Sequence, residues 1–172
     1  HFIINDKHYL VVANALSKKT GSFVYKLDSI IYEYDAARAK DKAFQEFQSI
    51  STIQAMDWEY LKIGGDKHYL IVANYYDGSS YNQNSVIYKY NGVTKQFEKH
   101  QDIATIGARS IASFKINNDY FFVISNYAAL VSSTTKSYIY KYNSDNDQFE
   151  KMTGVQAIAS KSTSFWKYYN IG

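Results

Sequence analysis

The chain has 172 residues, of which 19 are Lys or Arg and 16 are Asp or Glu, so its formal net charge is +3. This mild charge, without a cluster of Lys and Arg, argues against nucleic-acid binding. Cys is absent, which excludes a disulfide framework, a zinc knuckle and a thiol nucleophile. No apolar run is long enough to span a bilayer, so membrane insertion is not expected.

Tyr is the outlier of the composition, with 18 copies beside ten Phe and no Pro. Aromatic and β-branched residues favour strands, and no sustained helical stripe of apolar residues occurs. The one helix-like stretch is Ala36–Glu46, which is rich in Ala and Lys. It leaves two alternatives open, a helical insertion or an ordinary polar loop, within a chain that is otherwise predicted to be all-β.

One segment occurs three times along the chain. Asp6–Asn14 is repeated almost letter for letter as Asp66–Asn74, and Asn118–Asn126 is a third, diverged copy. The final Asn therefore recurs after 60 and then 52 residues. Repetition at this period indicates an array of similar structural units.

The middle copy is predicted to contain four short strands. His68–Asn74 is an apolar run typical of a strand buried on both faces, and Ser85–Tyr90 alternates between two faces. Gln96–Ile103 is more polar, as expected of an outer strand, and Ser110–Ile116 supplies the fourth. Four antiparallel strands at this spacing predict one blade of a β-propeller.

The expected blades cover residues of about 6–64, 66–117 and 118–172 in a single repeat domain. Ser164–Tyr168 is expected to form the last strand. Three blades make an open arc with exposed strands and faces, which favours association. We therefore expect self-association or a companion chain to complete a ring of six or seven blades.

Three equivalent asparagines, Asn14, Asn74 and Asn126, each follow an apolar strand. Two interpretations remain open. The amide either ties the end of the strand to a neighbouring loop or lines a repeated ligand pocket.

The loop after the second copy contains several tyrosines beside polar residues. Flat aromatic faces with polar tips suit stacking on sugars, and they equally suit a protein interface. Chance is a third explanation, because Tyr is abundant throughout the chain. The predicted ligand-binding residues are Asn74, Tyr75, Tyr76, Asp77, Tyr81, Asn126 and Tyr127.

No catalytic or metal-binding set is evident. His8 and His68 are repeat-equivalent and therefore favour a scaffold role, and His100 lies in a predicted outer strand. No paired metal-ligand spacing is present, so neither a metal nor a cofactor is expected. Asp57 and Glu59 flank a Trp on one strand, where motif packing is favoured over acid–base chemistry.

Four segments, which follow one another along the sequence, resemble the EAR repeat, also called the epitempin or epilepsy-associated repeat. They are Ala55–Gly65, His68–Asn74, Ser85–Tyr90 and Phe97–Ile103. The resemblance implies β-propeller blades of extracellular proteins that bind partners and do not catalyse reactions. Members usually have seven blades, whereas this chain has three copies.

The expected function is that of a secreted, non-enzymatic recognition protein. The first hypothesis is a lectin that binds glycans or glycoproteins through the rim loops of the propeller. The alternative is a protein-receptor ligand or adhesion module, like the neuronal members of the family.

Overall fold

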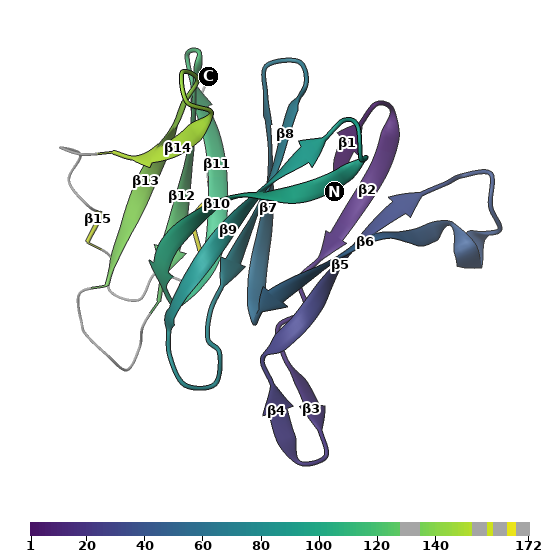
Figure 1. The fold of residues 1–172 in the computed structure, drawn as a ribbon, viewed down its shortest axis with the longest axis horizontal. Helices are drawn as coiled ribbons and strands as arrows, with labels where there is room; N and C mark the ends of the chain where they lie inside the picture. The colour runs from purple at the N-terminus through teal and green to yellow at the C-terminus, as the bar shows by residue number, and fades with distance from the viewer. Residues whose placement is uncertain (128–134, 153–157, 160–164, 168–172) are drawn as a thin grey trace.

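The computed structural model describes residues 1–127, 135–152, 158–159 and 165–167. Within them the fold is all-β, as predicted, and its strands form separate antiparallel sheets (Figure 1). The Ala36–Glu46 stretch contains only one turn of 3-10 helix, η1 (Lys40–Lys42), before a strand begins at Phe44. In the described part of the chain, no helix is both long and apolar enough to cross a membrane.

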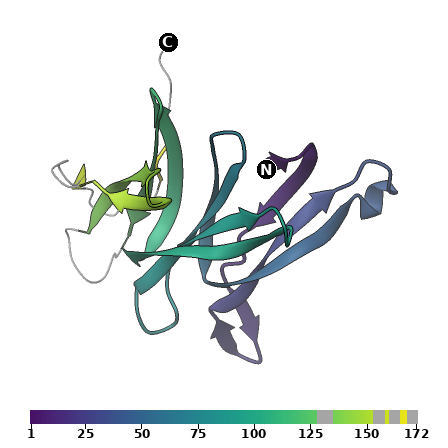
Figure 2. The same cartoon turned by 45° about the horizontal axis from the view of Figure 1, so that its top comes forward.

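Three four-stranded meanders follow one another along the chain (Figures 1 and 2). Sheet 1 consists of β1 (Phe2–Ile4), β2 (Lys7–Val12), β5 (Lys26–Tyr34) and β6 (Phe44–Ile53). Sheet 2 consists of β7 (Ala55–Ile63), β8 (Lys67–Asn74), β9 (Asn82–Asn91) and β10 (Gln96–Ile106). Sheet 3 consists of β11 (Ala108–Ile116), β12 (Asp119–Asn126), β13 (Lys136–Asn143) and β14 (Gln148–Lys151).

Two smaller pieces complete the described structure. A hairpin of β3 (Ser17–Lys19) and β4 (Ser22–Val24) is inserted between β2 and β5. The short strand β15 (Ile158–Ala159) pairs with the start of β13. The strand expected over Ser164–Tyr168 is not observed at residues 165–167, and its two end residues lie outside the described residues.

Each sheet begins one strand earlier than predicted. The sequence places Ala55–Ile63 at the end of the first blade, but this strand hydrogen-bonds to β8 and is the first strand of sheet 2. The cause is the connecting geometry. A tight turn with Gly64 at φ 63° keeps β7 paired to β8, whereas single residues with positive φ, Gln54 and Gly107, direct the chain into the next sheet. The expected boundaries near 65 and 117 are therefore wrong by one strand.

Aromatic side chains fill the two seams between neighbouring sheets. Successive residues of β8 point to opposite sides, so that Tyr69 and Ile71 pack towards sheet 3 while Leu70 packs towards sheet 1. In the seam between sheets 2 and 3, the ring of Tyr69 meets the ring of Phe149 edge-on, with the centroids 5.3 Å apart. Burial of such side chains contributes about 2 kcal/mol each, which makes the seams the main source of stability.

A glutamine clamps the outer edge of each seam. The amide of Gln48 on β6 donates to the carbonyl of Phe97 and accepts from its N–H, both at 2.8 Å. Gln101 on β10 makes the same pair of bonds to Phe149, at 2.8 and 2.9 Å. These paired bonds hold the outer strands of successive sheets in one register.

Two carboxylates join the inner edges of sheets 2 and 3. Asp57 on β7 accepts the N–H of Ile111 at 2.8 Å, and Glu59 accepts the N–H of Ser113 at 2.9 Å. Burial raises the pKa of both carboxyl groups, although these hydrogen bonds partly offset it. The geometry supports the packing interpretation of these two residues.

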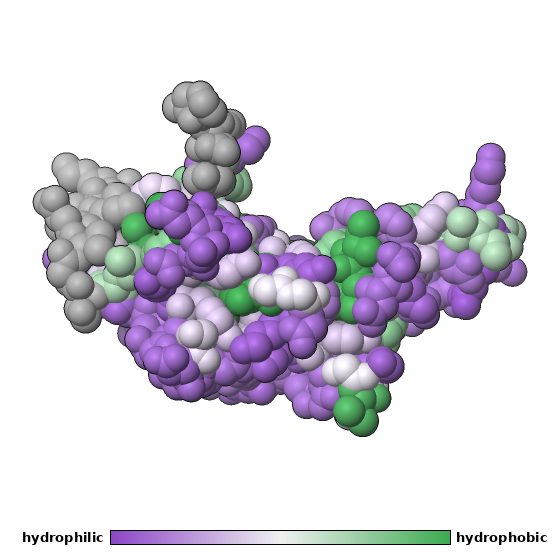
Figure 3. Space-filling view, turned by 90° about the horizontal axis from the view of Figure 1, so that it is seen from above, coloured by the Kyte–Doolittle hydropathy of each residue, from purple (hydrophilic) through white to green (hydrophobic). Residues whose placement is uncertain are grey.

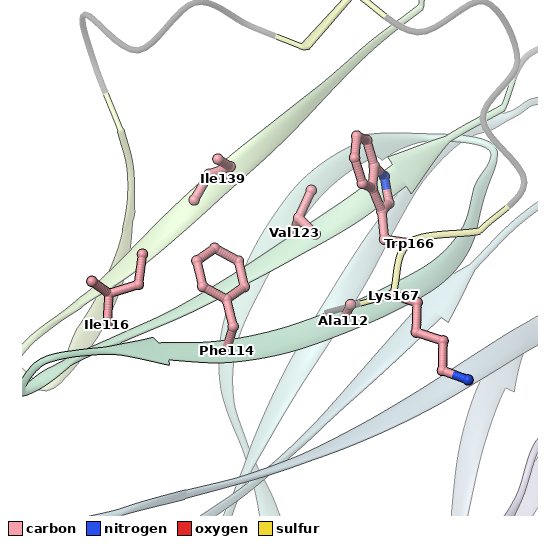
Figure 4. Close-up of a pocket in the computed structure, with 7 residues that line it drawn as sticks. All are labelled: Ala112, Phe114, Ile116, Val123, Ile139, Trp166 and Lys167. Carbon is pink, nitrogen blue, oxygen red and sulfur yellow. The ribbon is translucent and has the colours of Figure 1, made fainter. Parts of the chain in front are cut away.

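Sheets 1 and 3 each have one face that no other described sheet covers. On sheet 1 this face carries Leu10, Val12 and Phe44, which are 38%, 37% and 51% exposed. On sheet 3 it forms an apolar hollow of about 250 Å³, which Trp166 partly covers (Figure 4). The hollow is lined by Ala112, Phe114, Ile116, Val123, Ile139, Trp166 and Lys167. Green apolar patches are also visible in the surface view of Figure 3.

Asp147, in the turn between β13 and β14, reaches across the seam to sheet 2. Its carboxylate accepts hydrogen bonds from Lys89 Nζ and the Tyr142 hydroxyl at 2.6 Å, from the Tyr69 hydroxyl at 2.7 Å and from Lys67 Nζ at 3.1 Å. Burial raises the pKa of Asp147, but these four hydrogen bonds outweigh burial and hold that pKa below its usual value. The carboxylate is therefore a charged tie between two sheets.

Replacing Asp147 by Asn is expected to lower the free energy of unfolding at pH 7 by about 2 kcal/mol, the scale of hydrogen bonds to charged groups. Because the pKa is lower in the folded state, the contribution of the carboxylate is present above about pH 4 and is lost as the pH falls below it. Urea unfolding at neutral and strongly acidic pH should therefore show a difference that disappears on acidification. Asp145→Asn, in the same turn, is the matched control, and an equal loss in that variant would contradict the assignment.

Candidate functional site

The predicted site residues lie along one edge of the arc, at the lower side of Figure 1, which we call the lower rim. The rim comprises the connections that follow β2 and β8, Tyr127 directly after β12, and the two single-residue corners between sheets, Gln54 and Gly107. Tyr75 to Tyr81 form the connection between β8 and β9, and Tyr127 follows β12. The meander therefore brings residues that are about 50 positions apart onto one surface.

The asparagines are structural ties. Asn74 Oδ1 accepts the N–H of Ile53 at 3.1 Å, and its Nδ2 donates to the carbonyl of Asn84 at 2.8 Å. Asn126 makes the equivalent two bonds one sheet further along, at 3.1 and 2.9 Å. Both side chains are buried, at 3% and 5% exposure. The structure supports the tying role and removes Asn74 and Asn126 from the candidate ligand-binding set.

Asp77 shapes the loop that carries the tyrosines. Its Oδ1 accepts the backbone N–H groups of Ser80 and Ser79, both at 2.8 Å, and the hydroxyl of Ser79 at 2.9 Å. These hydrogen bonds hold the pKa of Asp77 well below its usual value. Asp77 is therefore charged at neutral pH and committed to its own turn.

The tyrosine rings of the loop pack against one another. The Tyr76 and Tyr81 centroids lie 4.5 Å apart at an interplanar angle of 32°, and Tyr75 meets Tyr81 edge-on at 5.1 Å. Tyr25, which precedes β5, extends the row by an edge-on contact with Tyr76 at 5.3 Å. Tyr25 was not predicted from the sequence, because it lies in the insertion that has no counterpart in the other two copies.

Arg109 continues this row towards sheet 3. Its Cζ lies 4.2 Å from the ring centroid of Tyr127 and 5.4 Å from that of Tyr75. The backbone pairing shifts between Ala108 and Ser110, so Arg109 falls at a bulge and leaves the regular alternation of β11. The same shift occurs around Met56 on β7, which is the repeat-equivalent residue. The sequence carries no signal for Arg109 because a bulge is not visible in an alternation pattern.

Gly107 fixes the corner beneath these rings. Its N–H donates to the carbonyl of Tyr81 at 2.7 Å, and its own carbonyl accepts the N–H of Tyr127 at 2.8 Å. Its φ of +59° is in the left-handed region, and a Cβ there would lie 2.2 Å from the Tyr127 carbonyl oxygen. Only glycine can occupy this position without displacing the rim.

Within the described residues, no cluster of three or more His, Asp or Glu side chains could hold a metal ion. His68 hydrogen-bonds through Nδ1 to the Tyr60 hydroxyl at 2.6 Å, and His100 through Nε2 to the Asp147 carbonyl at 2.6 Å. These histidines take part in packing between strands and sheets. The rim itself is an aromatic surface with one guanidinium set into it, which suits binding.

Gly107→Ala is expected to lower the free energy of unfolding by about 3 kcal/mol, because the added methyl group meets the Tyr127 backbone and the left-handed φ is strained. Gly92→Ala is the control, since an added Cβ meets no atom within 4 Å there. Denaturant unfolding of both variants measures the difference. Equal stabilities would show that the corner is not constrained as described.

Comparison with known proteins agrees with the repeat structure. The model of the EPTP domain matches residues 43–91 and 96–143, which together are more than half of the chain. Over 140 residues the chain is 37% identical to the human (Homo sapiens) thrombospondin-type laminin G domain and EAR repeat-containing protein and 34% identical to that of the mouse (Mus musculus). The aligned region is 81% of this chain but 20% of each relative, so the chain spans about a fifth of their length. The chain belongs to the EPTP-domain family, the family of the EAR repeats.

Proposed function

We propose that the chain is a non-enzymatic, extracellular recognition module that binds a protein partner at the lower rim. The observation that carries this proposal is the continuous row of aromatic rings and one guanidinium that runs from Tyr25 to Tyr127 across the ends of three sheets. Tyr and Arg are the side chains that most often anchor protein interfaces. The seams behind the row hold the backbone in place, so little ordering is needed on binding.

The packing of the rings favours a protein partner over a sugar. A lectin of the predicted kind needs ring faces that are open to the C–H faces of a sugar. Here Tyr76 and Tyr81 lie against each other at 4.5 Å, and Arg109 covers a face of Tyr127 at 4.2 Å. The amides of Asn74 and Asn126, which could have bound the hydroxyl groups of a sugar if they lined a ligand pocket, instead form hydrogen bonds with the backbone. Carbohydrate binding is therefore the second candidate.

The double variant Tyr76→Ala/Tyr81→Ala is expected to weaken binding to intact cells by about ten-fold or more, as truncation of central aromatic anchors does. Flow cytometry with the labelled protein, before and after protease treatment of the cells, measures both the binding and its dependence on surface proteins. Val93→Ala is the control, because Val93 is 90% exposed in a turn at the opposite end of sheet 2.

A glycan array with the same proteins separates the two candidates. Cell binding that survives protease treatment, together with array binding that the tyrosine variant loses, would replace the protein partner by a carbohydrate. Equal binding by the tyrosine variant and the wild type would exclude the rim altogether.

We infer further that the open faces of sheets 1 and 3 are covered by a second copy of the chain, which would give a six-bladed ring. Phe44 is the repeat-equivalent of Phe97 and Phe149, which are buried in the seams, yet Phe44 is 51% exposed. The open face of sheet 3 offers an apolar hollow of about 250 Å³ at the other end of the arc. Head-to-tail contact would therefore continue the interface that already joins the three sheets.

Sedimentation equilibrium is expected to give the mass of two chains, and Leu10→Glu on sheet 1 or Ile116→Glu on sheet 3 should reduce it to one. In an equal mixture, a dimer of one Leu10→Glu chain and one Ile116→Glu chain has both substitutions at the same junction. Its other junction is unmodified, so the mixture should recover dimers. Val93→Glu, which places the same charge on an exposed turn, should stay dimeric. A monomeric wild type would rule out the second copy as the partner.

A further inference from the structure

We propose that Arg109 binds a carboxylate of the partner, so that the lower rim recognises an acidic peptide segment. This inference rests on the proposed function, because it names the chemistry that the rim selects. Arg109 is held between Tyr75 and Tyr127, and its guanidinium is planar, permanently charged and shaped to bind a carboxylate with two parallel hydrogen bonds.

The guanidinium is poorly satisfied within the described structure. Arg109 Nε is buried and has no hydrogen-bond partner. A buried donor without an acceptor is destabilising, and charged donors are affected most. The two flanking rings stabilise the positive charge through their faces, but no hydrogen bond joins the side chain of Arg109 to another described residue. Because Nε is buried, a carboxylate of the partner would bind the two terminal nitrogens of the guanidinium, which would gain an acceptor on binding.

No carboxylate of the described residues forms an ion pair with Arg109. The neighbouring segment 128–134, Ala-Ala-Leu-Val-Ser-Ser-Thr, contains neither Asp nor Glu and therefore cannot supply one. The contrast is with Arg38, the other Arg of the chain, whose Nε lies 3.2 Å from Asp35. Arg109 is thus a cation on the rim without a counterion among the described residues.

The surroundings of Arg109 on the rim are positive. Lys18 and Lys19 lie on the β3–β4 hairpin, and Lys26 and Lys136 begin β5 and β13 at the same edge; all four are exposed. None of these lysines is in an ion pair with another described residue. Such a surface attracts an acidic segment over about a Debye length before contact, and Arg109 then selects a carboxylate at short range.

The acidic residues of the rim do not neutralise its positive charge. Asp77 is bound by the N–H groups of its own turn, and Asp28 accepts the Ser49 hydroxyl at 3.0 Å. Neither carboxylate forms an ion pair with a described lysine or arginine. The positive charge of the rim therefore remains available to a partner.

The test uses an eight-residue oligoglutamate peptide as the probe and an oligoglutamine peptide of the same length as its neutral counterpart. NMR titration of the ¹⁵N-labelled chain should show saturable shifts at Tyr75, Arg109 and Tyr127 with oligoglutamate and none with oligoglutamine. Arg109→Met, which installs the residue that β7 carries at Met56, should weaken this binding by about ten-fold. Lys19→Gln should weaken it by about two-fold or less, as expected for a charge that acts at long range.

The opposite outcomes overturn the proposal. Equal losses in Arg109→Met and Lys19→Gln would show only non-specific attraction. Binding of a heparin tetrasaccharide without binding of oligoglutamate would show that the rim selects sulfate groups of a glycan. Absence of oligoglutamate binding by the wild type also contradicts the proposal. Arg109→Met should unfold at the same temperature as the wild type, so that a loss of binding in the variant reports the missing guanidinium and not a damaged fold.

The cell-binding assay distinguishes this failure from failure of the proposed function. If Tyr76→Ala/Tyr81→Ala loses binding to cells while Arg109→Met keeps it, the rim is the binding surface but the carboxylate is not what it recognises. If neither variant changes binding, the rim itself is not the interface. Loss in both variants, together with selective oligoglutamate binding, supports both proposals.

Discussion

Each sheet of this protein is apolar on both faces, and every other feature of the structure depends on that constraint. A strand such as β8, with Tyr69 directed to one side and Leu70 to the other, requires a neighbouring sheet on each side. In the stacked arrangement, a glutamine tie fixes the outer edge of each seam, and the two carboxylate ties fix the inner edge of the seam between sheets 2 and 3. The same constraint leaves, at each end of the arc, one apolar face that no other described sheet covers.

The two ends of the strands serve different purposes. At one end, the carboxylate of Asp147 binds two lysines and two tyrosine hydroxyls at the seam between sheets 2 and 3. These charged groups hold the two sheets together. At the other end, the asparagine ties and the Gly107 corner satisfy the backbone, which leaves the side chains of the lower rim available. The backbone of such a surface is rigid, while its side chains still have groups free to contact a partner, and this combination favours binding.

Repetition in the sequence was sufficient to predict the four strands of the middle copy, which are β8, β9, β10 and β11, because alternation and apolar runs repeat along the chain. It did not predict the β3–β4 hairpin, which has no counterpart in the other copies. It did not predict where one sheet ends and the next begins. A single residue with positive φ, such as Gln54, separates two sheets, whereas the three-residue turn that begins at Gly64 separates two strands of one sheet. For the site, the residues of the predicted tyrosine loop form the connection between β8 and β9 at the lower rim, and their role in binding stays a prediction. The roles of the asparagines were left open, and Arg109 was missed because its direction comes from a bulge.

The internal copies share the residues that hold the sheets together and differ in residues of the lower rim. Gln48 and Gln101 occupy the same place and make the same bonds, since a side-chain amide can donate to a backbone carbonyl and accept from a backbone N–H at once. At the rim, by contrast, the bulge that holds Arg109 in sheet 3 holds Met56 in sheet 2, with the same shift in pairing. The backbone therefore tolerates either a cation or a thioether at this place. Binding chemistry can change there from one blade to the next at little cost to the fold, so the rim is where an array of similar blades acquires distinct specificity.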